Sequence, residues 1–173
     1  MSEAVIISGS PSARSRSRRL LSLAAARLAR DGVAATTIDL CDLPAEDLLG
    51  RTRTPAVEAA LAAVASARLV IVGTPVYRAS FSGLLKVFFD LFPQEALAGK
   101  VAIAVATGAG PAHALVIDHA LRPLLASVGA LVVATGVYGI DAQFTDEGPD
   151  AALAARIERA VAEAQEALSH VTR

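Results

Sequence analysis

The chain has 173 residues, 54% of them hydrophobic, and a formal net charge of −1. This length suits one domain over residues 1–173, and the near-neutral charge excludes the broad basic surface of nucleic-acid or anionic-membrane binders. The single cysteine, Cys41, excludes an intramolecular disulfide and a cysteine-based zinc cluster, and it is typical of the reducing cytoplasm.

In chain order, the first predicted elements are a strand, a helix and a second strand. Residues 5–7 form an apolar β-branched run, typical of a buried strand. Residues 17–30 place apolar side chains at helical spacing, and Gly32 lies where a helix usually stops. Residues 34–40 predict the second strand. The N-terminus lacks a basic region followed by a long apolar run, so no signal peptide is expected.

The middle of the chain continues this alternation. The polar segment 42–54 contains proline and glycine and is predicted as a loop. A helix is predicted over 56–67, a strand over 69–73 and a helix over 83–92. This last helix, GLLKVFFDLF, is apolar all round, so a monomer is expected to expose phenylalanine side chains that a second copy would cover.

The last part predicts a strand over 101–107, a helix over 112–128, a strand over 131–135 and a helix over 150–170. Its long uncharged stretches are at or below the length that crosses a bilayer, and glycines interrupt them. We therefore expect core elements and no membrane span. Pro123 lies inside the helical run and predicts an irregularity near residues 118–123, either a kink or a π-bulge.

Continuously apolar strands that alternate with helices predict a parallel sheet covered on both faces. Five strands in this rhythm suit a flavodoxin-like doubly wound sheet of order 2-1-3-4-5. Ligands of such sheets bind at the carboxyl ends of the strands, beside strand one. The three loops expected there read GSPSARSRS (9–17), GTPVYRASFSG (73–83) and TGAGPAH (107–113).

These loops together indicate a ligand with a phosphate at one end and a flat ring at the other. The first loop offers serine hydroxyls, Arg16 and a helix N-terminus, which favour an anion. Pro75 and Tyr77 in the second loop can line a flat ring, and Gly108 lets the backbone approach a ligand closely. A serine-capped helix start, an aromatic cap on the core and an ordinary turn are the alternative interpretations of the three loops.

Three motifs, GSPxxxSRS, PVYRASFSGLLKVFFDLFP and ATGAGPAH…DHALRPLLASVGA, resemble the NAD(P)H-dependent FMN reductases of two-component alkanesulfonate and methanesulfonate monooxygenase systems. The resemblance covers about residues 5–143. It implies a flavodoxin-like fold, FMN as cofactor or substrate, NAD(P)H as hydride donor, a homodimer or homotetramer and a partner flavin-dependent monooxygenase.

The resemblance also implies a set of FMN-binding residues. The flavin phosphate would be held by Ser10, Ser15, Arg16 and Ser17. The isoalloxazine ring would be bordered by Pro75, Val76, Tyr77, Arg78 and Ala79, and its edge touched by Thr107 and Gly108. Ser80 and Ala109 complete the expected set. Ala109 stands where the family usually has glycine, and members carry Tyr or His at the position of His119, in a helix irregularity near a subunit interface.

We expect hydride transfer from NAD(P)H to FMN with no protein acid or base, because the cofactors carry the chemistry. No Cys-x5-Arg phosphatase loop or Gly-x-Ser-x-Gly elbow is present, and His113 and His119 are spaced too unfavourably for a metal site. A quinone or azo reductase with bound FMN is the alternative. A flavodoxin-type electron carrier is disfavoured, since flavodoxins are strongly acidic and this chain has a net charge of −1.

Overall fold

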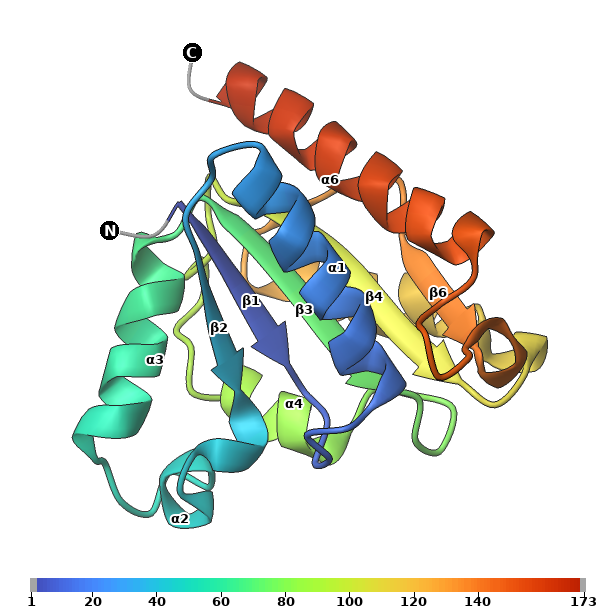
Figure 1. Cartoon of the computed structure of the whole chain (residues 1–173). Helices are drawn as coiled ribbons and strands as arrows, with labels where there is room; N and C mark the ends of the chain where they lie inside the picture. The colour runs from blue at the N-terminus through green and yellow to red at the C-terminus, as the bar shows by residue number, and fades with distance from the viewer. Residues whose placement is uncertain (1–2, 172–173) are drawn as a thin grey trace.

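Six parallel strands form the sheet at the centre of the computed structural model, which describes residues 3–171 (Figure 1). They are β1 (Ala4–Ser8), β2 (Ala35–Asp39), β3 (Leu69–Pro75), β4 (Val101–Gly108), β5 (Leu131–Val132) and β6 (Val137–Ile140). The order is β2-β1-β3-β4-β5, and β6 also pairs with β4. This order confirms the predicted flavodoxin-like doubly wound sheet.

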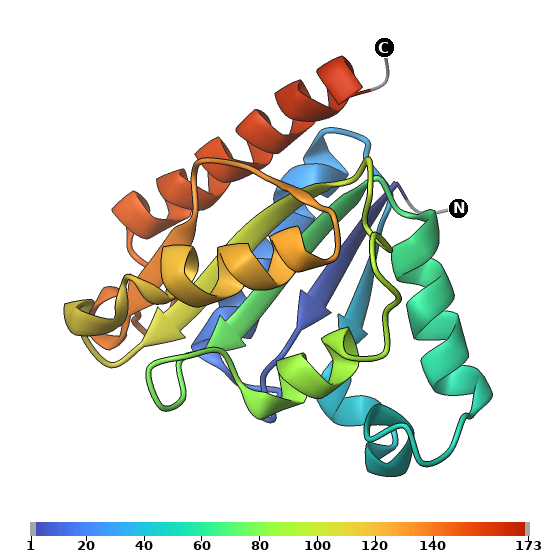
Figure 2. The ribbon, with the colours of Figure 1, turned by 180° about the vertical axis from the view of Figure 1, so that it is seen from behind.

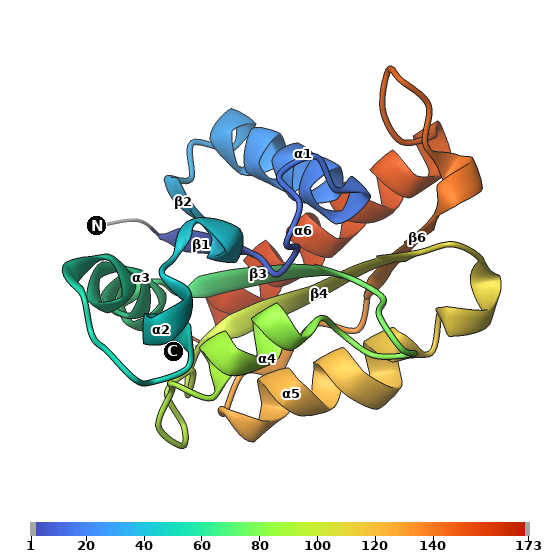
Figure 3. The same ribbon diagram turned by 90° about the horizontal axis from the view of Figure 1, so that it is seen from below.

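Helices cover both faces of the sheet. Figure 1 shows α1 (Arg16–Arg30) and α6 (Ala151–Val171) in front of the strands. Figure 2, seen from behind, shows α3 (Pro55–Ser66), α4 (Gly83–Phe89) and α5 (Arg122–Ser127) on the opposite side. Figure 3 looks along the layers and separates the two helical groups above and below the sheet.

Both faces of the central strands β1, β3 and β4 are buried, which explains why these three strands are apolar without alternation. In β1, Val5 and Ile7 point into the core beneath α3, α4 and α5, whereas Ala4 and Ile6 point into the core beneath α1 and α6. All four residues are fully buried. No helix within residues 3–171 combines the length and hydropathy that a membrane crossing requires.

The predicted loop over 42–54 contains a short helix, α2 (Ala45–Leu48), so that prediction was incomplete. Asp47 is buried and its carboxylate organises the segment that follows α2. It accepts hydrogen bonds from the Thr52 hydroxyl (2.5 Å), the Thr54 backbone N–H (3.0 Å) and the Thr54 hydroxyl. Hydrogen bonding by Thr52 and Thr54 lowers the pKa of Asp47, so the carboxylate stays ionised near neutral pH.

The predicted helix over 112–128 is not one regular helix. A short 3₁₀ turn (Pro111–His113) leads to a π-helix (Ile117–Leu121), and only then does α5 begin. Pro123 lies in the first turn of α5, where its missing N–H is tolerated. Of the two irregularities that the sequence left open, the structure therefore shows the π-helical one.

The strand predicted over 131–135 ends at Val132, and the chain returns to β4 only as β6. Side chains satisfy the backbone between the two strands. Arg122 donates to the carbonyls of Val133 (2.9 Å) and Ala134 (3.2 Å). Glu163 accepts from the N–H groups of Ala134 (2.7 Å) and Thr135 (2.9 Å). The interruption is thus stabilised by partners distant in sequence.

Helix α4 corrects the expectation of an exposed phenylalanine patch. Phe88 and Phe89 are buried, and Phe92 is partly buried. The Phe88 and Phe92 rings meet edge to face, with centroids 5.3 Å apart. The predicted helix over 83–92 ends at Phe89, so Phe92 lies beyond it. Phe88 and Phe89 fill the core of one subunit and give no reason for a second copy to cover α4.

The close packing of α1 on β3 generates a prediction. A Cβ at Gly73 would lie 2.7 Å from Leu21 Cδ1 and 2.8 Å from its Cγ. Gly73→Ala should therefore destabilise the protein by about 1–3 kcal/mol, the usual cost of overpacking a core. Urea unfolding measures the change. Gly83→Ala is the control, since a Cβ there meets nothing within 4 Å, and an equal effect of the two variants would contradict the packing argument.

Candidate functional site

The loops that follow β1, β3 and β4 meet at the carboxyl edge of the sheet, as the sequence predicted. The register explains why: Ser8 pairs with Gly73, and Pro75 pairs with Thr107. The loops border a cleft of about 490 Å³. It is lined by Ser10, Ser12, Arg14, Ser15, Arg16, Arg19, Pro75, Val76, Tyr77, Thr107, Gly108, Ala109 and Asp141.

The first loop presents hydrogen-bond donors around the start of α1. Ser15 caps this helix: its hydroxyl oxygen accepts from the Arg18 N–H at 3.2 Å. The N–H groups of Arg16 and Ser17, in the first helical turn, have no acceptor inside the helix. The helix dipole adds partial positive charge there, so this end of the cleft favours an anion.

The serine hydroxyls of the first loop differ in their surroundings. Ser10 is buried, and its hydroxyl oxygen accepts from the Ser12 N–H at 3.1 Å. Ser17 is also buried, and its hydroxyl lies 3.2 Å from that of Ser15. Ser17 is not among the residues that line the cleft, so its side chain supports Ser15 from below the surface.

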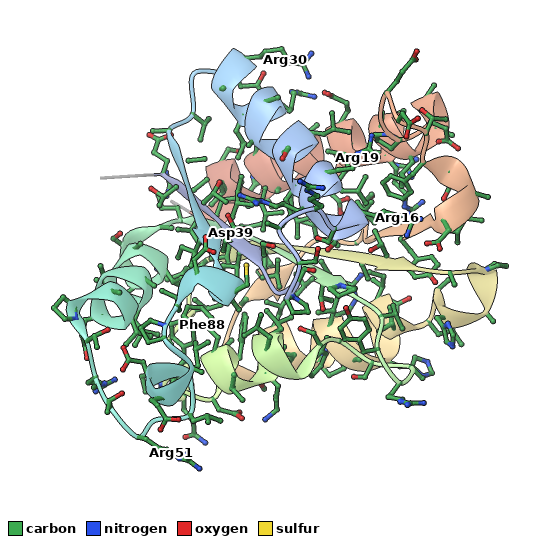
Figure 4. All side chains as sticks on the ribbon, turned by 60° about the horizontal axis from the view of Figure 1, so that its bottom comes forward. Arg16, Arg19, Arg30, Asp39, Arg51 and Phe88 are labelled. Atoms are coloured by element: carbon green, nitrogen blue, oxygen red, sulfur yellow. The ribbon has the colours of Figure 1, made fainter. Side chains whose placement is uncertain are left out.

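Arginine side chains give this end of the cleft positive charge. Figure 4 shows Arg16 and Arg19 projecting from the start of α1. Arg19 donates to the carbonyl of Asp146 at 2.9 Å. Arg16 Nη1 lies 3.1 Å from Asp141 Oδ1, and both side chains are about half exposed (48% and 45%). Arg14 also lines the cleft.

The second loop folds into a tight turn at the cleft. Tyr77 N–H donates to the Ser80 carbonyl at 2.9 Å, and Ser80 N–H returns a bond of 3.0 Å. The central residues Arg78 and Ala79 have φ of 51° and 62°, values that favour glycine. The turn directs Tyr77 into the lining, whereas Arg78, Ala79 and Ser80 lie outside the lining set.

The third loop is fixed to the second and to β6. Val76 N–H donates to the Thr107 carbonyl at 2.7 Å, and the Tyr138 hydroxyl donates to the Gly110 carbonyl at 2.6 Å. A Cβ at Gly108 would lie 2.4 Å from the Tyr138 hydroxyl oxygen, so a larger residue here would displace that hydroxyl from Gly110. Burial, with the charge of Asp141 as a smaller cause, raises the pKa of Tyr138 and keeps the phenol a donor.

The structure thus brings most of the expected residues to one cleft. Those that line it are Ser10, Ser15, Arg16, Pro75, Val76, Tyr77, Thr107, Gly108 and Ala109. Sequence reasoning did not place Ser12, Arg14, Arg19 or Asp141 in the FMN-binding set. Asp141 follows β6, a strand that was not predicted, and Ser12 and Arg14 belong to the loop that was singled out.

The cleft fits FMN in size and in donor chemistry. Its volume lies within the range of small-molecule sites, and its anion-favouring end suits a phosphate. Pro75, Val76 and Tyr77 provide an apolar wall at the other loop. His113 and His119 are exposed and neither lines the cleft. The lining therefore offers hydrogen-bond donors and an apolar wall to a ligand, and neither histidine belongs to it.

Comparisons with known proteins show the family of this chain. Residues 2–145 match the family described as NADPH-dependent FMN reductase. An FMN reductase (NADPH) of Pseudomonas putida is 46% identical over 140 residues, which are 80% of this chain and 71% of that protein. The NADH-dependent FMN reductase SfnE of Pseudomonas putida is 46% identical over 124 residues, 68% of this chain and 67% of that protein.

A solved structure is similar over nearly the whole chain. The apo form of the NADH:FMN oxidoreductase EMOB has a TM-score of 0.89 and 38% identity, and the match covers 97% of this chain and 90% of that one. The sheet order, the cleft and these matches lead to one conclusion. The chain belongs to the NADPH-dependent FMN reductase family and is an NAD(P)H:FMN oxidoreductase with a flavodoxin-like fold.

Proposed function

We propose that this reductase uses FMN as a diffusible substrate and supplies reduced FMN to a separate flavin-dependent monooxygenase. The observation that supports this proposal most directly is the composition of the cleft. Among its lining residues only Tyr77 is aromatic, and that side chain is 49% exposed. Stacking of a flavin ring between two aromatic side chains, which would hold it tightly, has no basis in this lining.

In this proposal the first loop binds the flavin phosphate. The donors are the Ser10 and Ser15 hydroxyls, the Arg16 guanidinium and the first N–H groups of α1. Ser17, buried beneath Ser15, holds that hydroxyl in place, with 3.2 Å between the two oxygens. A phosphate at a helix N-terminus with serine and arginine donors needs no metal ion for its charge to be compensated.

The second and third loops border the isoalloxazine ring in this proposal. Pro75, Val76 and Tyr77 form one side, and Thr107, Gly108 and Ala109 form the other. Arg78, Ala79 and Ser80 shape the turn that presents Tyr77. The hydrogen bond from Val76 to Thr107 (2.7 Å) keeps the two loops at a fixed separation. This rigid border can orient the ring for a nicotinamide.

Bound FMN supplies the hydride acceptor, and NAD(P)H supplies the hydride. The chain contributes position rather than proton transfer. The titratable side chains in the lining are Arg14, Arg16, Arg19, Tyr77 and Asp141. Of these, Asp141 faces Arg16 at the end of the cleft that we assign to the phosphate. Orientation of two bound rings accounts for rate enhancement without a catalytic residue.

The partner and the assembly complete the proposal. The three motifs resemble reductases of two-component sulfonate monooxygenase systems, and an open cleft suits a product that must leave for another enzyme. A homodimer or homotetramer in the cytoplasm is part of the same proposal. Its basis is the resemblance, because the phenylalanines of α4 are buried within one subunit.

The phosphate assignment predicts a selective loss of affinity. Arg16→Ala should weaken FMN binding about tenfold and leave riboflavin binding unchanged, because only FMN carries the phosphate. This magnitude is the lower end for a hydrogen bond to a charged group, since Arg16 is half exposed. Flavin fluorescence titration measures both affinities. Arg53→Ala, which removes a similarly exposed arginine paired with Glu58, is the control. Equal losses for the two flavins would refute the assignment.

The diffusible-flavin proposal predicts a weakly bound FMN. We expect a dissociation constant on the order of 1 μM, about −8 kcal/mol. Freshly purified protein should be largely colourless, and added FMN should be lost on dialysis. The flavin absorbance at 450 nm per protein measures occupancy. A yellow protein that keeps a full complement of FMN through dialysis and a cycle of NADPH reduction would instead be a quinone or azo reductase with resident FMN.

A further inference from the structure

One side chain in the cleft has a charge that opposes the proposed ligand. Among the described residues that line the cleft, Asp141 is the only carboxylate. Its Oδ1 lies 3.1 Å from Nη1 of Arg16, the arginine assigned to the flavin phosphate. A carboxylate and a phosphate are both anions that bind guanidinium groups, so they are alternative partners for Arg16.

The backbone places Asp141 at the cleft whether or not Arg16 is near. Ile140, the residue before it, is paired with Gly108 by the register of β6 and β4. The Ile140 N–H donates to the Gln143 side-chain oxygen at 3.1 Å, and the Asp150 N–H donates to the Gln143 carbonyl at 2.7 Å. Asp141 therefore begins a short turn that is held from both sides.

The groups that can move are then the two side chains, those of Arg16 and Asp141. Arg16 and Asp141 are about half exposed, with side-chain exposures of 48% and 45%. A half-exposed ion pair is weak, so it forms and opens readily. Arg16 can thus change partners when a phosphate enters, while the backbone of Asp141 stays at the edge of the cleft.

We propose that Asp141 is an affinity-determining residue: it competes with the flavin phosphate for Arg16 and weakens the binding of FMN. This inference rests on the proposed function, in which the first loop binds the phosphate and reduced FMN must leave. Asp141 keeps Arg16 occupied in the empty cleft and takes it back as the flavin departs. The open cleft then favours turnover of flavin over retention.

The expected size of this effect follows from the weakness of the pair. A surface ion pair that is populated roughly 50–85% of the time reduces the apparent affinity of a competing ligand by roughly two- to sixfold. The same geometry has one alternative role, in which Asp141 orients Arg16 toward the phosphate. The two roles predict changes of opposite sign.

The test is the affinity of Asp141→Asn for FMN and for riboflavin, measured by flavin fluorescence titration. The inference predicts FMN binding roughly two- to sixfold tighter, with riboflavin binding unchanged. Asp90→Asn is the matched control, because it removes one carboxylate from the Lys86–Asp90 pair, of similar exposure (49% and 56%), on α4 and its C-cap. Unchanged or weaker FMN binding, or equal tightening of both flavins, would overturn the inference.

Arg16→Ala separates this inference from the proposed function. In the Arg16→Ala background, the gain from Asp141→Asn should largely disappear, because there is no guanidinium left to compete for. A full gain in that background would overturn competition for Arg16. If Arg16→Ala alone does not distinguish FMN from riboflavin, the phosphate assignment itself fails. If Arg16→Ala does distinguish them but Asp141→Asn does not tighten FMN binding, only the role of Asp141 is wrong.

Discussion

The hydrogen-bonded register of the parallel strands places every part of the cleft. Ser8 of β1 lies beside Gly73 of β3, and Thr107 of β4 lies between Pro75 of β3 and Gly139 of β6. The loops that leave these strands must therefore begin side by side. The contact of α1 with Gly73 fixes the start of that helix against the same edge. Without this register, the serines, the arginines and Tyr77 would not share a surface.

The resulting cleft offers many polar groups to a ligand and few aromatic side chains for stacking. Hydroxyls, guanidinium groups and helix N–H groups lie at one end of the cleft. At the other end the lining has a single aromatic side chain, Tyr77, which is half exposed. We propose that such a site recognises a ligand by its charge and shape without enclosing it. In our proposal, the ion pair between Arg16 and Asp141 also competes with the phosphate for the Arg16 guanidinium. These features agree with an enzyme that passes its flavin on.

Continuous apolar runs predicted β1, β3 and β4, because the part of a sheet that is buried on both faces leaves no polar alternation to read. The same pattern missed β6, whose four residues, VYGI, are too few to stand out and become a strand through pairing with β4. It also missed α2. This short helix contains Asp47, whose hydrogen bonds to Thr52 and Thr54 reach five and seven residues ahead, and no local pattern indicates them. The loop residues of the site were predictable from their position after strands. Asp141 was not, because its place depends on β6.

The initial rate of NADPH or NADH oxidation at increasing FMN concentration tests the central claim most directly. With FMN as a diffusible substrate, the protein as purified should oxidise almost no NAD(P)H without added FMN, and the rate should rise and saturate as FMN is added. Addition of a quinone in place of FMN should then give little activity. A full rate with a quinone as acceptor and no added FMN would contradict the claim.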